Sequence, residues 1–480
     1  MQAVYIAYLR PRVTCVHIRI LRKIYDMNKY QPIIGLEIHV ELKTNSKMFC
    51  GCPADWFGKP PNSNNCPVCL GLPGALPVPN KKAIEWTIKI AKALNCQINK
   101  VSKFDRKNYF YPDLPKAYQI SQYDAPIGVH GNVKFKIQSS KFKVEDKNIK
   151  ITRVHLEEDT GKLLHQGADT LVDFNRSGVP LVEIVTEPDF RNSDDCKLFL
   201  EELQTILRYL DVSDCDMEKG SMRVEPNISL SNFKVQSSNV KFVLPSYKVE
   251  VKNINSFRYA KYAIDYEIER QAEILDSGQT PVQETRGFNE NKNITFSQRV
   301  KEEAHDYRYF PEPDIPPMIF SQKFLEEIKV PELPSQRVNR YINEFKLRYQ
   351  DAFILTRHKD VAFFFEAVNS KFKMQNSKLD LKIKNHETKL ASLMINKKIS
   401  SKLSADEFIN KAIDLLTPKL NNETQIKAII DKIIQENPKP VADYKKGKTN
   451  VLMFLVGQVM KEMKGKADAN VIMSALKNKI

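Results

Sequence analysis

The sequence predicts an α+β protein in which a strand-rich N-terminal part is followed by helices. Four segments between residues 30 and 290 alternate apolar and polar side chains with the period of two that is typical of half-buried strands. Beyond Pro334 the apolar residues recur at helical spacing, and the proline-rich segments Phe310–Pro317 and Val330–Pro334 separate the two patterns. The length of 480 residues fits about two or three domains.

Composition shifts divide the chain into four expected regions. These are a basic extension over 1–29, a strand-rich domain over 30–296 with a cysteine-bearing loop at 50–69, a helical domain over 297–400 and a helical tail over 401–480. Helical periodicity predicts single helices over Asn80–Leu94, Asp194–Leu210, Ser256–Leu275 and Val451–Met460. No apolar run approaches the roughly 20 residues that span a bilayer, so we expect a soluble protein without a membrane partner.

Residues 1–29 carry six arginines and lysines against one acid, Asp26. This balance is typical of an organelle presequence. The alternative is an over-extended start, because Met27 lies just before the first patterned strand. The segment lacks the apolar core of a secretory signal, so we expect a reducing compartment: the bacterial cytoplasm, or an organelle if the segment is a presequence.

The formal net charge of +16 indicates a polyanionic partner, for which nucleic acid is the usual candidate. A lysine-rich genome is the alternative explanation. Two segments add aromatic rings to this basic character: Phe104–Gln122 and Asp306–Asp314 interleave tyrosines with arginine and lysine. Such segments can stack on bases and contact phosphates, or they can form the packed core of a loop.

The first strand, Gly35–Leu42, has an unusual polar face. Its apolar residues occupy one side, and Glu37, His39 and Glu41 occupy the other. Carboxylate and imidazole groups side by side are a good ligand set for a divalent metal. A solvated sheet edge is the alternative for this strand taken alone.

Three further segments repeat this design with carboxylates next to cations or amides. A sheet face of this kind can bind Mg²⁺ and the phosphates that it bridges, without a glycine-rich loop. Four such strands in one domain are difficult to explain as solvated faces. The polar residues are Arg153, His155 and Glu157 in Ile151–Lys162, followed by Glu158 and Asp159; Arg223, Glu225 and Asn227 in Gly220–Leu230; and Glu250, Lys252 and Asn253 in Val249–Phe257.

Four of the eight cysteines are closely spaced. Cys50, Cys52, Cys66 and Cys69 form the pattern Cys-x-Cys-x13-Cys-x2-Cys. Two close pairs of thiolates in turns that contain glycine and proline are typical of a tetrahedral structural zinc site. Such a site has no open position, so it would stabilise a loop and perform no chemistry. Reduced free cysteines are the alternative.

These motifs together identify a family. The chain resembles the B subunit of the aspartyl/glutamyl-tRNA amidotransferases over about residues 30–480. The resemblance is weak over Lys371–Leu403, and residues 1–29 have no counterpart. The segments that carry it are Gly35–Leu42, Phe104–Asp113, His155–Lys162, Val172–Pro188, Met222–Leu230 and Asp306–Pro316.

The resemblance implies a fold and an activity. The fold is an antiparallel-sheet cradle similar to the catalytic sheet of glutamine synthetase, followed by a helical domain and a small helical tail that contacts tRNA. The activity uses ATP and Mg²⁺ to phosphorylate the side-chain carboxylate of a mischarged Glu-tRNA(Gln) or Asp-tRNA(Asn). Ammonia from an amidase, the A subunit, then forms the amide. The implied partners are this amidase, a small C subunit, the mischarged tRNA and the non-discriminating aminoacyl-tRNA synthetase.

The resemblance also implies roles for residues of this chain. The Mg²⁺ ligands would come from Glu37, His39, Glu157, Glu158 and Glu250. The nucleotide or reacting carboxylate would be contacted by Arg223, Glu225, Asn227, Lys252 and Asn253. The four cysteines match the zinc-bearing members of the family, and the tail lysines Lys445, Lys446, Lys448, Lys461 and Lys464 would contact tRNA. The alternative function is a zinc-stapled tRNA-binding scaffold without kinase activity.

Overall fold

The computed structural model describes residues 29–138, 144–232, 244–300, 307–378, 383–416, 423–463 and 469–480. Residues 1–28 of the predicted extension and Lys464 lie outside this range. The chain divides into two compact units, the first ending at Asn339 and the second running over Arg340–Ile480. None of the helices in the described ranges is long and apolar enough to cross a membrane.

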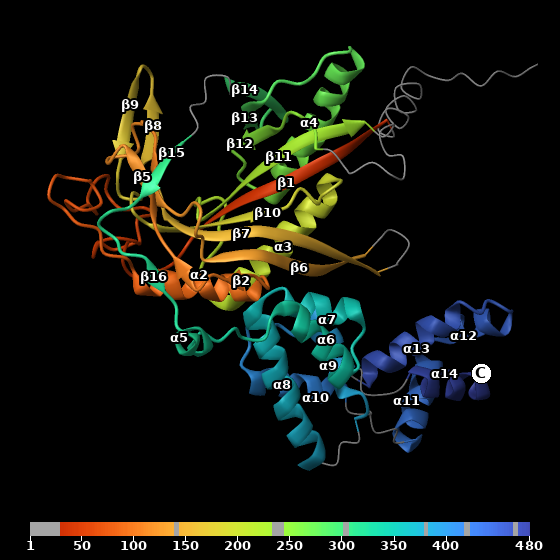
Figure 1. The fold of residues 1–480 in the computed structure, drawn as a ribbon. Coiled ribbons are helices and arrows are strands. Elements are labelled where there is room, and N and C mark those ends of the chain that lie inside the picture. The colour runs from red at the N-terminus through yellow and green to blue at the C-terminus, as the bar shows by residue number, and fades with distance from the viewer. Residues whose placement is uncertain are drawn as a thin grey trace, which may run out of the picture. The chain divides into compact units, whose positions relative to one another are not determined.

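A nine-stranded sheet organises the first unit (Figure 1). Its strand order is β14-β13-β12-β11-β1-β10-β7-β6-β2, and every described pair is antiparallel except β12–β13. The α+β prediction is therefore confirmed. The strands are β1 (Tyr30–Glu41), β2 (Gln97–Ile98), β6 (Gly128–Gln138), β7 (Val144–Glu158), β10 (Pro180–Thr186), β11 (Met222–Asn232), β12 (Val249–Lys252), β13 (Glu284–Asn289) and β14 (Ile294–Val300).

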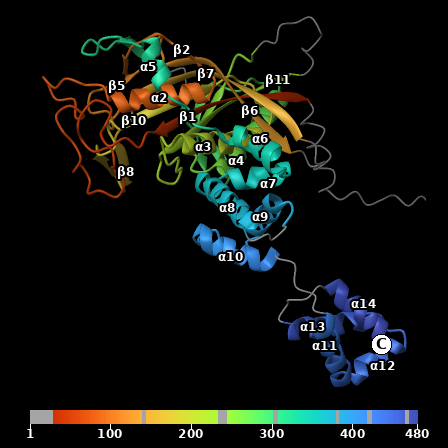
Figure 2. The same cartoon turned by 90° about the horizontal axis from the view of Figure 1, so that it is seen from below.

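Three helices pack on the sheet: α2 (Lys81–Ala93), α3 (Ser193–Leu210) and α4 (Phe257–Asp276). Figure 2 shows α3 and α4 alongside the strands. Asparagine or serine caps each helix at its N-terminus: the side chains of Asn80, Asn192 and Ser256 accept backbone N–H bonds from the first turn. The apolar side chains of the alternating strands join the helices in one core, which leaves their polar side chains on the opposite face.

Smaller sheets complete the first unit. One has the order β15-β4-β5, a second pairs β16 with β3, and a third is the hairpin β8–β9. Because β15 and β16 pair with β4 and β3, the first unit extends well beyond the boundary expected after residue 296. The strands are β3 (Val101–Ser102), β4 (Asp105–Asn108), β5 (Tyr118–Ser121), β8 (Lys162–Gln166), β9 (Asp169–Asp173), β15 (Arg308–Pro311) and β16 (Met318–Ile319).

The chain becomes helical at α5 (Gln322–Glu327). The break predicted over Asn396–Ser404 lies between α9 and α10, and the predicted buried helix Val451–Met460 corresponds to α13. The last four helices share an apolar core of their own, which includes Ile430 and Leu455. The remaining helices are α6 (Pro334–Phe345), α7 (Tyr349–Thr356), α8 (Lys359–Lys378), α9 (His386–Ile395), α10 (Ala405–Leu416), α11 (Glu423–Glu436), α12 (Pro438–Lys445), α13 (Val451–Glu462) and α14 (Ala469–Lys479).

Candidate active site

The polar face of the sheet carries one continuous row of ionisable side chains. Across the four strands β11, β1, β10 and β7, Arg223 is paired with His39, His39 with Glu183, and Glu183 with His155. Residues paired across neighbouring strands project to the same side of a sheet. Strand pairing therefore brings together side chains that are more than 180 positions apart in the sequence.

Two groups of potential metal ligands meet in this row. His39 Nε2 lies 3.4 Å from Glu183 Oε2 and 3.6 Å from Glu37 Oε1. His155 Nε2 lies 3.2 Å from the same oxygen of Glu183 and 3.6 Å from Glu157 Oε2. In each group, the ligand atoms lie within 4.8 Å of one another, and Glu183 belongs to both.

A third group contains only carboxylates. Glu37, Glu225 and Glu250 have oxygens within 4.8 Å of one another, so Glu37 takes part in two of the three groups. The ammonium group of Lys252 lies 2.9 Å from Glu225 and 3.6 Å from Glu250. Thr285 donates a hydrogen bond of 2.8 Å to the other oxygen of Glu250, which orients that carboxylate.

The local charge balance favours a bound cation. Burial, followed by repulsion from Glu183, raises the pKa of Glu37 to about 7. Burial lowers the pKa of His39, but the hydrogen bond with Glu183 and the charges of Glu183, Glu225 and Glu37 together outweigh this effect and raise the pKa to about 9. Carboxylates crowded in this way repel one another, and a divalent cation between them would relieve the repulsion.

Several side chains supply positive charge around the row. Arg153 lies 3.2 Å from Glu183, and Arg223 donates a hydrogen bond of 2.8 Å to the buried Asp159. Lys107 approaches from β4. Although burial lowers its pKa, the charges of Glu157 and Glu183 raise the pKa of Lys107 well above the ordinary value.

Two of the predicted site residues lie apart from these groups. Glu158 Oε2 lies 2.6 Å from Lys116 Nζ, and Glu158 Oε1 accepts a bond of 2.9 Å from the backbone N–H of Ile120. It lines a cavity of about 200 Å³ beside the cysteine-bearing loop. Asn253 is exposed and has a left-handed backbone just after β12 ends. Asn227, by contrast, is paired with Glu250 and lies on the polar face.

The sequence pattern does not single out Glu183, and it places His155 on a polar face without indicating a ligand role. The neighbours of Glu183 in β10 explain the first omission, because Leu181 and Val185 occupy the same side of the strand. A single glutamate in an otherwise apolar strand was the available signal, since a buried carboxylate needs a partner. His155 lay in an alternating strand already identified as polar-faced.

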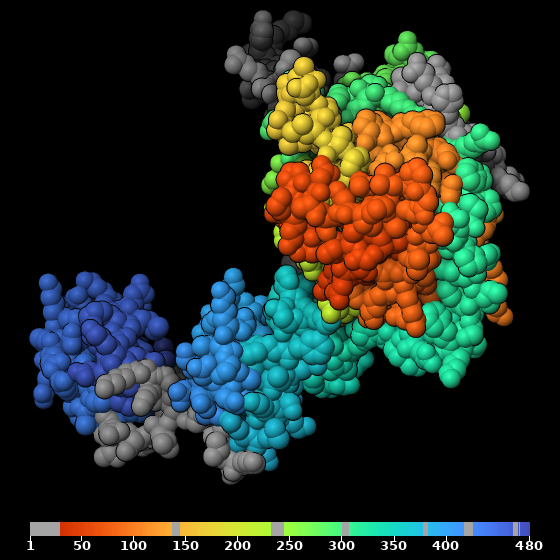
Figure 3. Space-filling model, turned by 90° about the vertical axis from the view of Figure 1, so that its left-hand side faces the viewer, coloured from red at the N-terminus to blue at the C-terminus, as the bar shows by residue number. Residues whose placement is uncertain are grey.

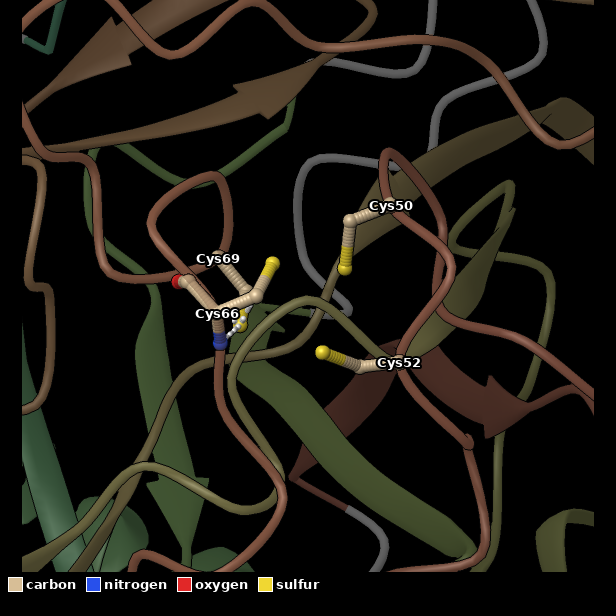
Figure 4. Close-up of side chains that lie close together, drawn as sticks. All are labelled: Cys50, Cys52, Cys66 and Cys69. Atoms are coloured by element: carbon tan, nitrogen blue, oxygen red, sulfur yellow. Dashed lines mark hydrogen bonds between the residues drawn. The ribbon is translucent and has the colours of Figure 1, made fainter.

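The four cysteines form a separate cluster (Figure 4). Their sulfur atoms lie within 4.8 Å of one another, and none forms a disulfide. A tetrahedral site with Zn–S bonds of about 2.3 Å needs sulfurs about 3.8 Å apart, so small adjustments would accommodate zinc. The ammonium group of Lys47, whose residue is fully buried, lies 3.7 Å from the sulfur of Cys69.

Figure 3 shows the cysteine-bearing loop on the surface, coloured red to orange. The loop is fastened to the hairpin β8–β9 by Asn62, whose backbone and side chain bond Asp173 and Val172, each at 2.9 Å. It also reaches the polar face, because Trp56 Nε1 donates a bond of 3.0 Å to Glu41. Burial and the nearby Asp159 raise the pKa of Glu41 to about 8.

The predicted tRNA-binding lysines that the structure describes are all exposed. Lys445 ends α12, Lys446 and Lys448 lie in the following turn, and Lys461 lies in the last turn of α13. Lys448 is 3.4 Å from Asp443. Lys445, Lys446 and Lys448 therefore precede α13, whereas Lys461 lies near its other end.

Comparison with known proteins assigns these features to a family. Residues 32–326 match the GatB/GatE catalytic domain, which covers the whole row of ionisable residues and the cysteine cluster. The chain belongs to the GatB family. Residues 373–480 match the GatB domain, and this GatB match includes nearly all of Lys371–Leu403, the segment expected to resemble the family weakly.

Named GatB relatives are similar over almost their entire length. The chain is 43% identical to the B subunit of the aspartyl/glutamyl-tRNA(Asn/Gln) amidotransferase of Carboxydothermus hydrogenoformans, over 95% of this chain and 99% of the relative. Identity is 44% to the same protein of Persephonella marina, over 92% and 98%. It is 45% to that of Thermoanaerobacter sp., over 94% and 99%.

Proposed function

We propose that this chain is the subunit that activates the carboxylate in the transamidation of Glu-tRNA(Gln) and Asp-tRNA(Asn). The observation that carries the proposal is the set of overlapping ligand groups on the sheet, which share Glu37 and Glu183. The relatives named above are amidotransferase subunits over nearly their whole length. A scaffold without chemistry would not need to keep these carboxylates crowded together.

The chemistry requires an activated carboxylate. Ammonia does not displace oxide from a carboxylate, because oxide is a poor leaving group. One carboxylate oxygen attacks the terminal phosphorus of ATP, and the bond between that phosphorus and ADP breaks. Ammonia then attacks the acyl carbon, inorganic phosphate leaves with that oxygen, and the amide forms after loss of a proton. Water must be kept from the acyl phosphate, and the burial of His155, Glu157 and Glu183 on the polar face favours this.

The ligand groups fit Mg²⁺ best where they offer only oxygen. Glu37, Glu225 and Glu250 would hold one ion. Glu183 would hold a second, either with Glu37 and His39 or with His155 and Glu157. Bound Mg²⁺ would neutralise charge on the transferred phosphoryl group. Lys252, Arg223 and Arg153 would orient the phosphates and the reacting carboxylate. Because Glu158 forms an ion pair with Lys116, we do not propose Glu158 as a Mg²⁺ ligand.

The proposal includes partners and a structural metal. Ammonia would come from an amidase, the A subunit of the enzyme, while a small C subunit would complete the assembly and a non-discriminating synthetase would supply mischarged tRNA. Zinc would occupy the four-cysteine cluster. The nine-stranded sheet would act as a cradle of the glutamine synthetase kind, and the bacterial cytoplasm is the proposed location, as the relatives are bacterial.

A reconstituted enzyme tests the proposal directly. The chain is co-expressed with its amidase partner and assayed with Glu-tRNA(Gln) and Asp-tRNA(Asn), each with and without ATP. We expect amide product on at least one tRNA that depends on ATP, and ATP hydrolysis that depends on mischarged tRNA. ATP hydrolysis that ignores the mischarged tRNA, or no product with either tRNA, would favour the scaffold alternative.

The exposed tail lysines are expected to make tRNA binding strongly dependent on salt. Each phosphate contact releases counterions, so replacing Lys445, Lys446, Lys448 and Lys461 with alanine should flatten the slope of log affinity against log salt by about 3. The measurement is tRNA binding by the complete complex at several salt concentrations. Replacing Lys397 and Lys398, two exposed lysines outside the tail, is the matched control. An unchanged slope in the tail variant would remove this role.

A further inference from the structure

Four tyrosines form a cluster on one side of the small sheet β15-β4-β5. We call Tyr109, Tyr123, Tyr307 and Tyr309 the tyrosine cluster. Tyr309 is paired with Lys107, and Lys107 with Gln119. Tyr109 and Tyr307 each lie two positions from a member of this row, and Tyr123 lies four from Gln119. These three tyrosines lie just beyond the ends of β4, β15 and β5, and their ring contacts place them on the side of Tyr309.

The rings of the cluster contact one another around the lysine. Tyr123 and Tyr309 are stacked with centroids 4.3 Å apart and planes 15° apart. Tyr109 meets Tyr307 edge to face at 5.3 Å, and Tyr307 lies 6.4 Å from Tyr309. The ammonium group of Lys107 is 4.7 Å from the ring centre of Tyr307. The cluster is therefore a preformed aromatic surface with a cation in it.

This surface faces the candidate active site. Ser121 lies on the same side of the small sheet as Lys107, and its hydroxyl donates a bond of 2.8 Å to Glu157. The charges of Glu157 and Glu183 also act on the ammonium group of Lys107 and raise its pKa. Figure 1 shows β15 and β5 at the end of the main sheet where the hairpin β8–β9 lies. The tyrosine cluster thus adjoins the proposed metal ligands.

The cluster differs from a packed loop core in two ways. Tyr123 and Tyr307 keep 61% and 46% of their surface exposed, although both rings are large and apolar. The ammonium group of Lys107 lies over the ring of Tyr307, and within the described residues it interacts with Glu157 and Glu183 through their charges rather than through a close ion pair. Both features leave binding capacity unused, since an aromatic face and a lysine normally find partners when partly buried.

The opposite side of the same small sheet provides a comparison. There Arg106 lies 4.5 Å from the ring centre of Tyr118 and pairs through two nitrogens with Glu312, at 2.7 and 2.8 Å. Glu312 itself is buried. That side also combines an aromatic ring with a cation, but the cation is fully satisfied within the chain. The unsatisfied side is the one that faces the carboxylates.

We infer that the tyrosine cluster binds the adenine base of a substrate, with Lys107 contacting the adjoining phosphate. The inference rests on the proposed function and assigns a base-binding site to it. Base stacking on tyrosine tolerates any base, while phosphate contact suits a flexible ammonium group. Adenine enters this reaction from two sources: ATP and the 3′-terminal adenosine of the tRNA. Both carry a phosphate beside the sugar and must reach the carboxylates.

Binding measurements on the complete complex test the inference. The variants are Tyr123→Ala, Tyr307→Ala and Tyr307→Phe, with Tyr262→Ala as the matched control, since Tyr262 is an exposed tyrosine on α4. In one arm the ligand is ATP. In the other it is uncharged tRNA, either intact or lacking its terminal adenosine. We expect the two cluster alanine variants to bind one ligand about tenfold or more weakly, and Tyr307→Phe to retain binding because stacking needs only the ring.

The two arms identify the source of the base. If the site takes the tRNA terminus, removing the terminal adenosine should weaken binding to wild type but hardly affect binding to Tyr307→Ala. If it takes ATP, only the ATP arm should change. Unchanged affinity for both ligands in the alanine variants would overturn the inference, as would an equal loss in Tyr307→Phe or Tyr262→Ala. The proposed function is tested by a different measurement: it would be refuted if the wild-type complex formed no amide product.

Discussion

Replacing Glu37 with glutamine is expected to abolish ATP-dependent amidation, with a loss of about a thousandfold, while the amidase partner continues to hydrolyse glutamine. Glu37 supplies an oxygen to two ligand groups, one with His39 and Glu183 and the other with Glu225 and Glu250. Glutamine keeps the size of the side chain but removes the charge. A single substitution therefore weakens both proposed metal sites without leaving a cavity.

Two further variants separate the groups. Glu183→Gln leaves the Glu37–Glu225–Glu250 group intact, whereas Glu250→Gln leaves the groups around Glu183 intact. The measurement is the rate of amide formation on mischarged tRNA over a range of Mg²⁺ concentrations, with glutaminase activity measured in parallel. Glu218→Gln, in the exposed turn before β11, is the control. Amidation close to wild type by Glu37→Gln would refute the assignment of these groups as metal sites.

Alternation predicted most of the site because half-buried strands display their polar residues in a regular pattern. His39, Arg223, Glu225 and Lys252 could be placed on one face from the sequence alone. Alternation could not identify which strands are neighbours. That information lies in pairings such as His39 with Glu183, which join residues of separate strands. The pattern therefore gave the polar face and missed the carboxylate at its centre.

The structure differs from the sequence-based expectation at two other places, and both differences arise from contacts between segments that are distant in the sequence. Glu158 follows a polar-faced strand, so its neighbours in sequence suggested a ligand, but Lys116 and Ile120 on other segments bind its carboxylate. The first unit continues to Asn339 because β15 and β16 return to pair with β4 and β3. A composition shift marks where strands give way to helices. It does not show which earlier strand a later segment will join.

Removing zinc is expected to destabilise the first unit, lowering its melting temperature by at least about 5 °C. The cluster links two turns of a loop whose residues are mostly exposed or half-buried, and a metal bound only to the folded state stabilises that state. The pKa of Cys69 is lowered to about 4, chiefly by a hydrogen bond from Cys50, so a thiolate is already favoured there. The measurement combines metal content with thermal unfolding, before and after chelation.

Cys69→Ser should reproduce the chelated protein, whereas Cys96→Ser, at a cysteine outside the cluster, should retain one zinc per chain and should not respond to chelation differently from wild type. Loss of zinc should also lower the rate of amidation. Trp56 belongs to this loop and donates to Glu41, beside the Asp159 that holds Arg223. Loosening the loop would therefore free Arg223 to move, so amidation should fall in Cys69→Ser even below its unfolding temperature. Less than about half an equivalent of zinc in gently purified wild type would contradict the site itself.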